Sequence, residues 1–324
     1  MSVTPQEIFT VAQVALLKHG AGENQAMHVA KAVARAEETG NVICGLYYLE
    51  SYCTQLKSGR VQGTVPPQVT KPRPASIFAD AKFGFAQPAF AAGLPVAIAA
   101  AREMGVATLS VAHAHTCTSL GYFTEQIAAE GLIAIGMTNA SPVVAPPGGN
   151  KAVIGTNPIA MSVPGDGELA MHFDFSTSAV ALGKITMAKA AGESIPLGWA
   201  VDADGQPTTD PEAALKGALV SAGGYKGWGF GLMVELLAAG MTGGVNSLDV
   251  SGLKLPNGQP HDLGQFYILI DPTTHGDQFA DRFARVAEAV ALQEGARLPG
   301  ADRKVFTDVD VPAALWTAVK LLAA

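Results

Sequence analysis

Four consecutive stretches decide the fold: PAFAAGLPVAIAAAREM (88–104), VATLSV (106–111), GYFTEQIAAE (121–130) and GLIAIGM (131–137). The first is rich in alanine, and both the first and the third are typical of helices. The second is rich in β-branched residues, and the fourth is a short apolar run of the kind found in buried strands. Helices and strands that alternate in this way predict a mixed α/β domain.

The residues before this region predict helices. Thr4 stands where a helix cap is expected, and apolar residues then recur at helical spacing over 8–17. Further helices are predicted at about 25–38 and 46–57. The prolines of 66–74 cannot continue a helix, so that stretch is either a linker or an extended edge, and it marks a boundary.

The residues after 137 alternate between turns and apolar segments. Residues 228–239 are apolar on nearly every face, which predicts a central, buried helix. A strand is predicted at 265–270 and an amphipathic helix at 277–293. We expect two parts: a helical region, 1–75, packed with 277–324, and a domain, 76–276, that holds cofactor and substrate.

Composition excludes several classes of protein. Of the 324 residues, 48% are hydrophobic and 15% are charged, which suits a large core and not a disordered chain. The formal charge of −7 leaves no basic surface for a nucleic acid. Gly93 and Pro95 interrupt the longest apolar run, which is too short to span a membrane.

The cysteines and the N-terminus indicate a compartment. Cys44, Cys53 and Cys117 are an odd number at uneven spacing, which favours reduced thiols. The first residues lack the basic and apolar regions of a signal peptide. We therefore expect a cytoplasmic protein.

A glycine-rich stretch is the first candidate site. No Gly-x-Gly-x-x-Gly run is present, and GGYKGWGFG at 223–231 lacks that spacing. The stretch either cradles a phosphate at a helix start, with Lys226 as the cation, or is a tight turn that lets a helix pack closely.

His113, His115 and Cys117 are the second candidate site. At i, i+2 and i+4 on an extended segment their side chains share one face. They could hold zinc with His172 or Asp174, hydrogen-bond to backbone at a strand end, or supply a catalytic histidine. No HExxH or CxxC motif accompanies them, so we expect no metal.

Read in order, several motifs resemble one family: GTNPIA (155–160), DFSTS (174–178), GKI (183–185), IPLGWA (195–200), GQPTTDP (205–211), GGYKG (223–227) and RLPG (297–300). Over about residues 5–305 the chain resembles the type-2 malate/L-lactate dehydrogenases. That family also includes diketogulonate reductase, ureidoglycolate dehydrogenase, sulfolactate dehydrogenase and the cyclic ketimine reductases.

The resemblance implies a non-Rossmann α/β fold with a mixed sheet, NAD or NADP as cofactor, and a homodimer. It implies hydride transfer between the nicotinamide and a small 2-oxo or 2-imino acid. By position it makes Thr156 a contact of the substrate carboxylate. The implied cofactor contacts are Thr116, Cys117, Thr118, Ser119, Leu120, Asp174, Phe175, Ser176, Tyr225, Lys226, Arg297, Leu298, Pro299, Gly300 and Arg303.

The chain departs from the family at the usual acid. The family carries Asp-Ser-His-Gly, in which the histidine donates a proton, and an arginine that follows grips the substrate carboxylate. Here Ile43 and Cys44 replace the serine and the histidine, and Tyr48 stands at the arginine position. Lys184 stands where ketimine reductases tend to place aspartate, so their Ser-His-Asp relay is missing. Tyr48 and Thr156 are the expected substrate contacts.

Reduction of a carbonyl still needs an acid with a pKa near neutrality. His115 adjoins Thr116, which matches the family's second histidine, and we predict that His115 donates the proton. Cys44 is a weaker candidate, because a thiol is a poor donor. Lys184 could donate the proton or hold the carboxylate, and Lys226 and Tyr47 follow.

These observations predict an NAD(P)-dependent 2-hydroxy acid dehydrogenase with a rearranged active site, acting on malate, lactate, sulfolactate or a similar small anion. A cyclic ketimine reductase is the alternative. A zinc hydrolase built on His113, His115 and Cys117, and an inactive protein that retains the cofactor site, are further alternatives.

Overall fold

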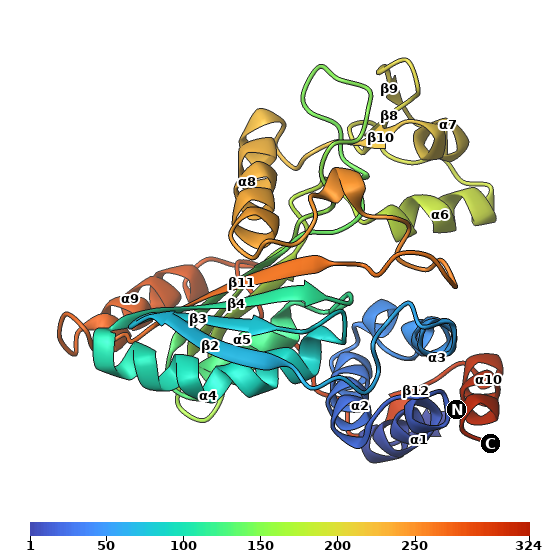
Figure 1. The fold of residues 1–324 in the computed structure, drawn as a ribbon. Coiled ribbons are helices and arrows are strands. Elements are labelled where there is room, and N and C mark those ends of the chain that lie inside the picture. The colour runs from blue at the N-terminus through green and yellow to red at the C-terminus, as the bar shows by residue number, and fades with distance from the viewer.

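The computed structural model describes residues 1–324 and is built around a seven-stranded sheet (Figure 1). β3 and β4 are parallel, and every other pair of neighbours is antiparallel. This mixed sheet confirms the predicted fold class. In spatial order the strands are β2 (Gln68–Arg73), β3 (Ser76–Asp80), β4 (Val106–Ala114), β11 (Leu263–Ile270), β5 (Ile133–Thr138), β6 (Ile159–Pro164) and β7 (Leu169–Phe175).

Two helices cover one face of this sheet. α4 (Ala86–Met104) packs on β3 and β4, and α5 (Gly121–Ala128) packs on β5 and β6 (Figure 1). Gly93 lets α4 approach closely, because a Cβ there would lie 2.6 Å from Leu109 Cδ1. Of the prolines between 66 and 74, Pro72 lies in the edge strand β2, where a missing amide is tolerated, and the others flank that strand.

The opposite face of the sheet carries α8 (Tyr225–Glu235) and the π-helical turn η3 (Leu236–Gly240). The prediction of a buried helix over 228–239 is wrong. Phe230 is 56% and Leu236 is 59% exposed, because only one stripe of the helix meets the sheet. α9 (Phe279–Ala291) forms as predicted, yet none of its residues is buried.

A second core joins the two ends of the chain. It contains side chains of α1 (Pro5–Lys18), α2 (Glu23–Glu38), α3 (Leu49–Ser58) and α10 (Ala313–Ala323). β1 (Ser2–Val3) pairs with β12 (Val309–Asp310), and Thr4 with Glu7 forms a capping box. Two 3-10 turns, η1 (Val42–Cys44) and η2 (Leu46–Tyr48), connect α2 to α3. The division into 1–75 with 277–324 and 76–276 stays a prediction.

A third, smaller core lies within residues 144–219. It packs α6 (Leu182–Ala191) and α7 (Pro211–Lys216) with the sheet of β10 (Ala218–Leu219), β8 (Ala200–Val201) and β9 (Pro207–Thr208). A Cβ on Gly183 would lie 4.0 Å from Ile43 Cδ1, so the start of α6 faces η1. A last 3-10 turn, η4, spans Ser247–Asp249. None of the helices has the length and hydropathy needed to cross a membrane.

Candidate active site

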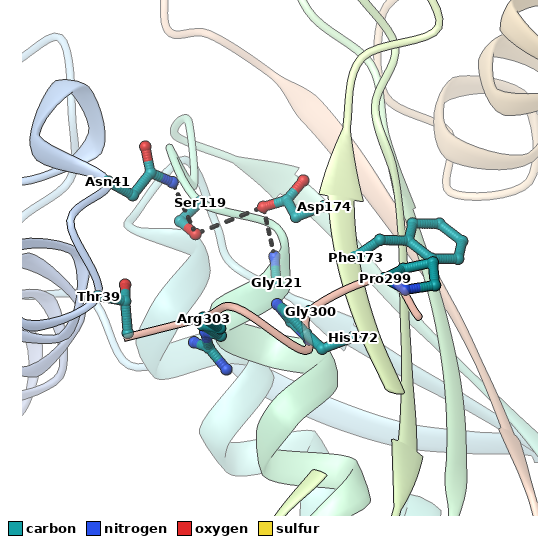
Figure 2. Close-up of a pocket in the computed structure, with 10 residues that line it drawn as sticks. All are labelled: Thr39, Asn41, Ser119, Gly121, His172, Phe173, Asp174, Pro299, Gly300 and Arg303. Atoms are coloured by element: carbon teal, nitrogen blue, oxygen red, sulfur yellow. Dashed lines mark hydrogen bonds between the residues drawn. The ribbon is translucent and has the colours of Figure 1, made fainter. Parts of the chain in front are cut away.

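Four segments that are distant in sequence enclose a polar pocket of about 310 Å³ (Figure 2). They are the end of α2 with the loop to η1, the start of α5, the end of β7, and the C-terminal loop around residue 300. The lining residues are Thr39, Asn41, Ser119, Gly121, His172, Phe173, Asp174, Pro299, Gly300 and Arg303. Five of these are predicted cofactor contacts: Ser119, Asp174, Pro299, Gly300 and Arg303.

Asp174 organises the floor of the pocket. Its Oδ2 accepts a hydrogen bond from the Gly121 amide at 2.7 Å and one from Ser119 Oγ at 3.4 Å. Asn41 Nδ2 donates to the same Ser119 hydroxyl at 3.4 Å, which completes the chain drawn in Figure 2. A carboxylate at the amino end of a helix is favoured by the exposed amides and the helix dipole. Asp174 therefore fixes β7 against α5 and sets the shape of the site.

The C-terminal loop forms the opposite wall. Gly300 has φ +85°, and a Cβ there would lie 2.6 Å from the His172 carbonyl oxygen. The His172 amide donates to the Pro299 carbonyl, so the loop is bonded to β7. Arg303 Nη2 donates to Glu125 Oε2 at 2.6 Å, and Glu125 also accepts from Arg35. The Glu125 contact holds Arg303 against α5.

Cys44 does not line this pocket, but its thiol lies beside two lining residues, Asn41 and Asp174. Burial raises the pKa of the Cys44 thiol to about 12, and the Asp174 carboxylate adds to the shift. Burial also raises the pKa of Tyr48 to about 12. Both groups are therefore neutral near pH 7, and neither is poised to exchange a proton.

His115 is not at the pocket. Its side chain is 2% exposed, and its Nε2 donates to Gln55 Oε1 at 2.6 Å. The direction of that bond follows from Gln55 Nε2, which donates to the carbonyls of Leu253 and Leu255. The ring stacks on His261 with 3.9 Å between centroids.

This environment keeps His115 neutral. Burial lowers its pKa well below the usual value, and the neighbouring His261 and Arg60 add to the shift. Its Nδ1 has no hydrogen-bond partner. In this conformation the His115 imidazole is neither charged nor accessible, so its placement does not favour the predicted role as proton donor.

His113, His115 and Cys117 do not converge, contrary to the expectation from an extended segment. His113 has φ +49°, which breaks the alternation of side chains at the end of β4. Its Nδ1 pairs with Asp262 Oδ1 at 2.7 Å, whereas His115 faces Gln55. No group of three histidine, cysteine or acidic side chains is arranged to hold a metal. This geometry does not support the zinc hydrolase reading.

The structure places the other predicted site residues around the pocket or away from it. Thr116, Cys117 and Leu120 are buried behind it, and Thr118 Oγ1 donates to the Cys44 carbonyl at 3.2 Å. Thr156 is half-buried, and its carbonyl accepts from Thr177. The remaining predicted site residues also lie outside the pocket lining: Phe175, Ser176, Tyr225, Lys226, Arg297, Leu298 and Lys184.

Two of these outlying segments have identifiable local roles. Ser178 and Ser221 bridge the segment after β7 to the start of α8, where Tyr225 and Lys226 are exposed. A Cβ on Gly227 would lie 1.9 Å from the Ala222 carbonyl oxygen, so glycine there allows a tight turn. This contact supports the packing interpretation of 223–231. Lys184 is exposed on α6, one residue after the glycine that faces Ile43.

Sequence reasoning missed half of the pocket lining: Thr39, Asn41, Gly121, His172 and Phe173. Thr39 and Asn41 directly precede the Val42–Cys44 segment, so proximity to Cys44 could have identified them. His172 was considered only as a possible zinc ligand, and no motif placed it beside the cofactor contacts. Its Nδ1 bonds to Ser162 Oγ at 2.8 Å, and burial lowers its pKa to about 4.

The pocket fits the polar part of a dinucleotide. Hydroxyl and amide groups of Thr39, Asn41 and Ser119 line it, and Arg303 adds a cation. Such donors suit ribose and phosphate oxygens. Gly300 lets the C-terminal loop lie against β7, because a Cβ there would collide with the His172 carbonyl. The residues present therefore agree with a cofactor of the NAD(P) type.

Comparison with known proteins places this site in a family. A family model described as malate/L-lactate dehydrogenase matches residues 3–307. A (2R)-3-sulfolactate dehydrogenase (NADP(+)) from Chromohalobacter salexigens is 38% identical, covering 93% of this chain and 90% of the relative. A Δ1-pyrroline-2-carboxylate reductase from Ancylobacter novellus is 37% identical, covering 98% and 96%.

A solved structure supports the same family assignment. The Δ1-piperideine-2-carboxylate reductase of Pseudomonas syringae superimposes with a TM-score of 0.91 and 34% identity, covering 99% of each chain. The resemblance of the sequence motifs is thus confirmed by whole-length matches in sequence and in fold. The chain belongs to the malate/L-lactate dehydrogenase family and is an NAD(P)-dependent oxidoreductase.

Proposed function

We propose that this enzyme transfers a hydride between NAD(P)H and C2 of a small 2-oxo acid. The main observation behind this proposal is the polar pocket lined by Asn41 and Asp174, because both residues lie beside Cys44, the position of the family's proton-donating histidine. The nicotinamide supplies the hydride when the cofactor is bound. The sulfolactate dehydrogenase among the relatives supports a 2-oxo acid as the substrate class.

The residues of the pocket have separable tasks in this proposal. Thr39, Asn41 and Ser119 hold polar groups of the cofactor, and Arg303 with Gly300 shapes the opposite wall. Asp174 keeps the start of α5 in place. Thr156 remains a proposed contact of the substrate carboxylate.

A 2-oxo acid also requires a proton donor, and the structure favours Lys184 over His115. Lys184 is exposed on the helix that faces η1, whereas His115 is enclosed by Gln55 and His261. Gln55 binds residues 253 and 255, so His115 is the donor only in a conformation in which that segment has moved.

A cyclic ketimine is a second candidate substrate, and one observation favours it. Burial raises the pKa of the Cys44 thiol and of the Tyr48 phenol to about 12, so no acid with a pKa near neutrality stands at the family's histidine position. A cyclic imine that binds as the iminium carries its own proton and needs no such acid. The pyrroline- and piperideine-carboxylate reductases among the relatives agree with this candidate.

The test is oxidation of NADH and NADPH with pyruvate, oxaloacetate, sulfopyruvate, and the two cyclic imino acids. Lys184→Met separates the candidates. It should lower kcat by about 10² to 10⁴ with a 2-oxo acid and by less than about threefold with an imine. Lys189→Met, on the same helix and also exposed, is the matched control. Absence of turnover by the unaltered enzyme with every substrate would refute the function.

We further propose that the enzyme is a homodimer in the cytoplasm. A second copy would cover the apolar side chains that a single chain leaves exposed on and after α8, Phe230, Leu236 and Met241 among them. The three cysteines are unpaired, in keeping with a reducing compartment. Light scattering should give twice the chain mass, and Leu236→Asp should shift it toward one chain.

A further inference from the structure

Lys254 is an exposed cation held on two tyrosine rings. Its Nζ lies 3.4 Å from the centroid of the Tyr47 ring and 4.6 Å from that of Tyr48. None of the ion pairs in the structure includes Lys254. The faces of the tyrosine rings attract the ammonium without neutralising its charge, so the cation stays available to an anion.

The backbone around Lys254 is fixed from below. Gln55 Nε2 donates to the carbonyls of Leu253 and Leu255, at 2.8 and 2.7 Å, on either side of the lysine. The buried Arg60 donates to the carbonyls of Gly252, Leu255 and Gln259 and to Ser251 Oγ. The position of Lys254 over the rings is therefore set by the structure and not by a freely moving loop.

The rings that hold Lys254 adjoin the site. Tyr48 follows Cys44 by four residues, and Cys44 lies close enough to contribute to the raised pKa of Tyr48. Tyr48 also stands at the position where the family resemblance placed a carboxylate-binding arginine. The other cations near the pocket, Arg35 and Arg303, both bind Glu125.

We propose that Lys254 binds the carboxylate of the substrate. The inference rests on the proposed function, because both candidate substrate classes carry a carboxylate beside C2. The tyrosine rings exclude water from one side of the ammonium, and a partly desolvated cation attracts a carboxylate more strongly. The charge reaches the site from the segment 251–261 and not from the helix that carries Tyr48.

The first measurement is calorimetric titration with oxalate and with oxamate, unreactive carboxylates that resemble a 2-oxo acid, in the presence of NADPH. Lys254→Met keeps the length of the side chain and removes its charge. It should weaken oxalate binding at least about tenfold, while the Kd for NADPH stays within twofold. Lys254→Arg should retain binding within about threefold, and the exposed Lys320→Met is the control for loss of one positive charge.

The second measurement is kinetic, with whichever substrate class is turned over. Lys254→Met should raise KM at least about tenfold with little change in kcat, and the effect should vanish for the amide of the same substrate. Adding Tyr48→Arg to Lys254→Met should restore part of the affinity, because it returns a cation beside Cys44.

The outcomes separate the two proposals. Failure of the unaltered enzyme to reduce any substrate refutes the function, while the oxalate titration still decides the role of Lys254. Oxalate affinity within twofold of the unaltered enzyme in a folded Lys254→Met variant overturns the assignment. Absence of oxalate binding by the unaltered enzyme with NADPH also overturns it.

Discussion

Arg60→Met should release the segment 251–261 while the rest of the molecule stays folded. Arg60 is 1% exposed and donates four hydrogen bonds, all to this segment. Methionine retains the apolar volume of the stem and removes every donor. The expected result is local opening, because the lost contacts connect one surface segment to α3 and do not lie in the apolar cores.

The free energy lost on substitution follows from the four hydrogen bonds and from two effects that reduce their contribution: the burial of the guanidinium and the access of water to the freed carbonyls. Hydrogen bonds from a charged donor contribute about 1.5–3 kcal/mol each, or about 6–12 kcal/mol in total. Burial of a guanidinium without a carboxylate partner offsets several kcal/mol of this. The accepting carbonyls of Gly252, Leu255 and Gln259 belong to exposed residues and can bind water instead. A net loss of about 3 kcal/mol remains, equivalent to about a hundredfold in an equilibrium constant.

Hydrogen exchange with mass spectrometry measures this opening. Peptides that contain the amides of Val250 and Leu255 should exchange up to about a hundredfold faster in Arg60→Met, and peptides from α4 and α5 should be unchanged. Oxalate affinity should fall together with the protection, because Lys254 moves with the segment. Arg102→Met is the control: its ion pair with Glu130 is about half exposed and contributes little.

Two results would refute this reasoning. Unchanged exchange over 250–262 in a folded Arg60→Met protein would mean that the four bonds do not hold the segment. Faster exchange with unchanged oxalate affinity would mean that Lys254 does not bind the substrate carboxylate, even if Arg60 holds the segment in place.

Three further predictions concern the site. Cys44→Ser should keep kcat within about tenfold, because a thiol with a pKa of about 12 is a poor acid at neutral pH; a loss above a hundredfold would contradict this. Gly300→Ala should weaken NADPH binding at least tenfold in a fluorescence titration, because its Cβ would collide with the His172 carbonyl, whereas Gly295→Ala, also at positive φ but in open space, should strain the backbone without affecting the cofactor. Stability should fall as pH drops below about 6.5, because the unfolded chain takes up protons that the folded chain excludes; urea unfolding at pH 7, 6 and 5 should show a slope of up to about 1.4 kcal/mol per pH unit for each histidine with a lowered pKa, and a flat profile would contradict the burial of His115, His172 and His261.

Local sequence patterns predicted the α/β class and several of its elements, because such patterns depend on neighbouring residues, whereas the mixed sheet was implied by the family resemblance. The alanine-rich α4 and the strands β4, β5 and β11 all lie where apolar periodicity placed them. The exposure of Phe230 on α8 could not be predicted in this way. It depends on how much of the sheet one helix can cover, and that is a tertiary property.

From the sequence, residues of the pocket could be predicted only where they belong to motifs of the family. RLPG and DFSTS identified Gly300 and Asp174, whereas Thr39 and His172 reach the pocket only through the fold. The expected convergence of His113, His115 and Cys117 fails for a specific reason: φ +49° at His113 turns the chain where an extended strand was assumed. Lys254 gave no signal, because a lysine in a polar loop is indistinguishable from a solvated one until its ring partners are known.

The replacements at Cys44 and Tyr48 have a common physical consequence. They remove an imidazole from position 44 and an arginine from position 48, and the thiol and phenol that stand there are neutral at pH 7. Charge must then come from other elements, and the structure offers Lys254 on the segment 251–261 and Lys184 on α6. Because these lysines lie on different elements, carboxylate binding and proton donation can be tested separately. A substrate that brings its own proton would need only Lys254, whereas a 2-oxo acid would need both. The ratio of the effects of Lys254→Met and Lys184→Met on kcat/KM therefore reports which class of substrate the enzyme reduces.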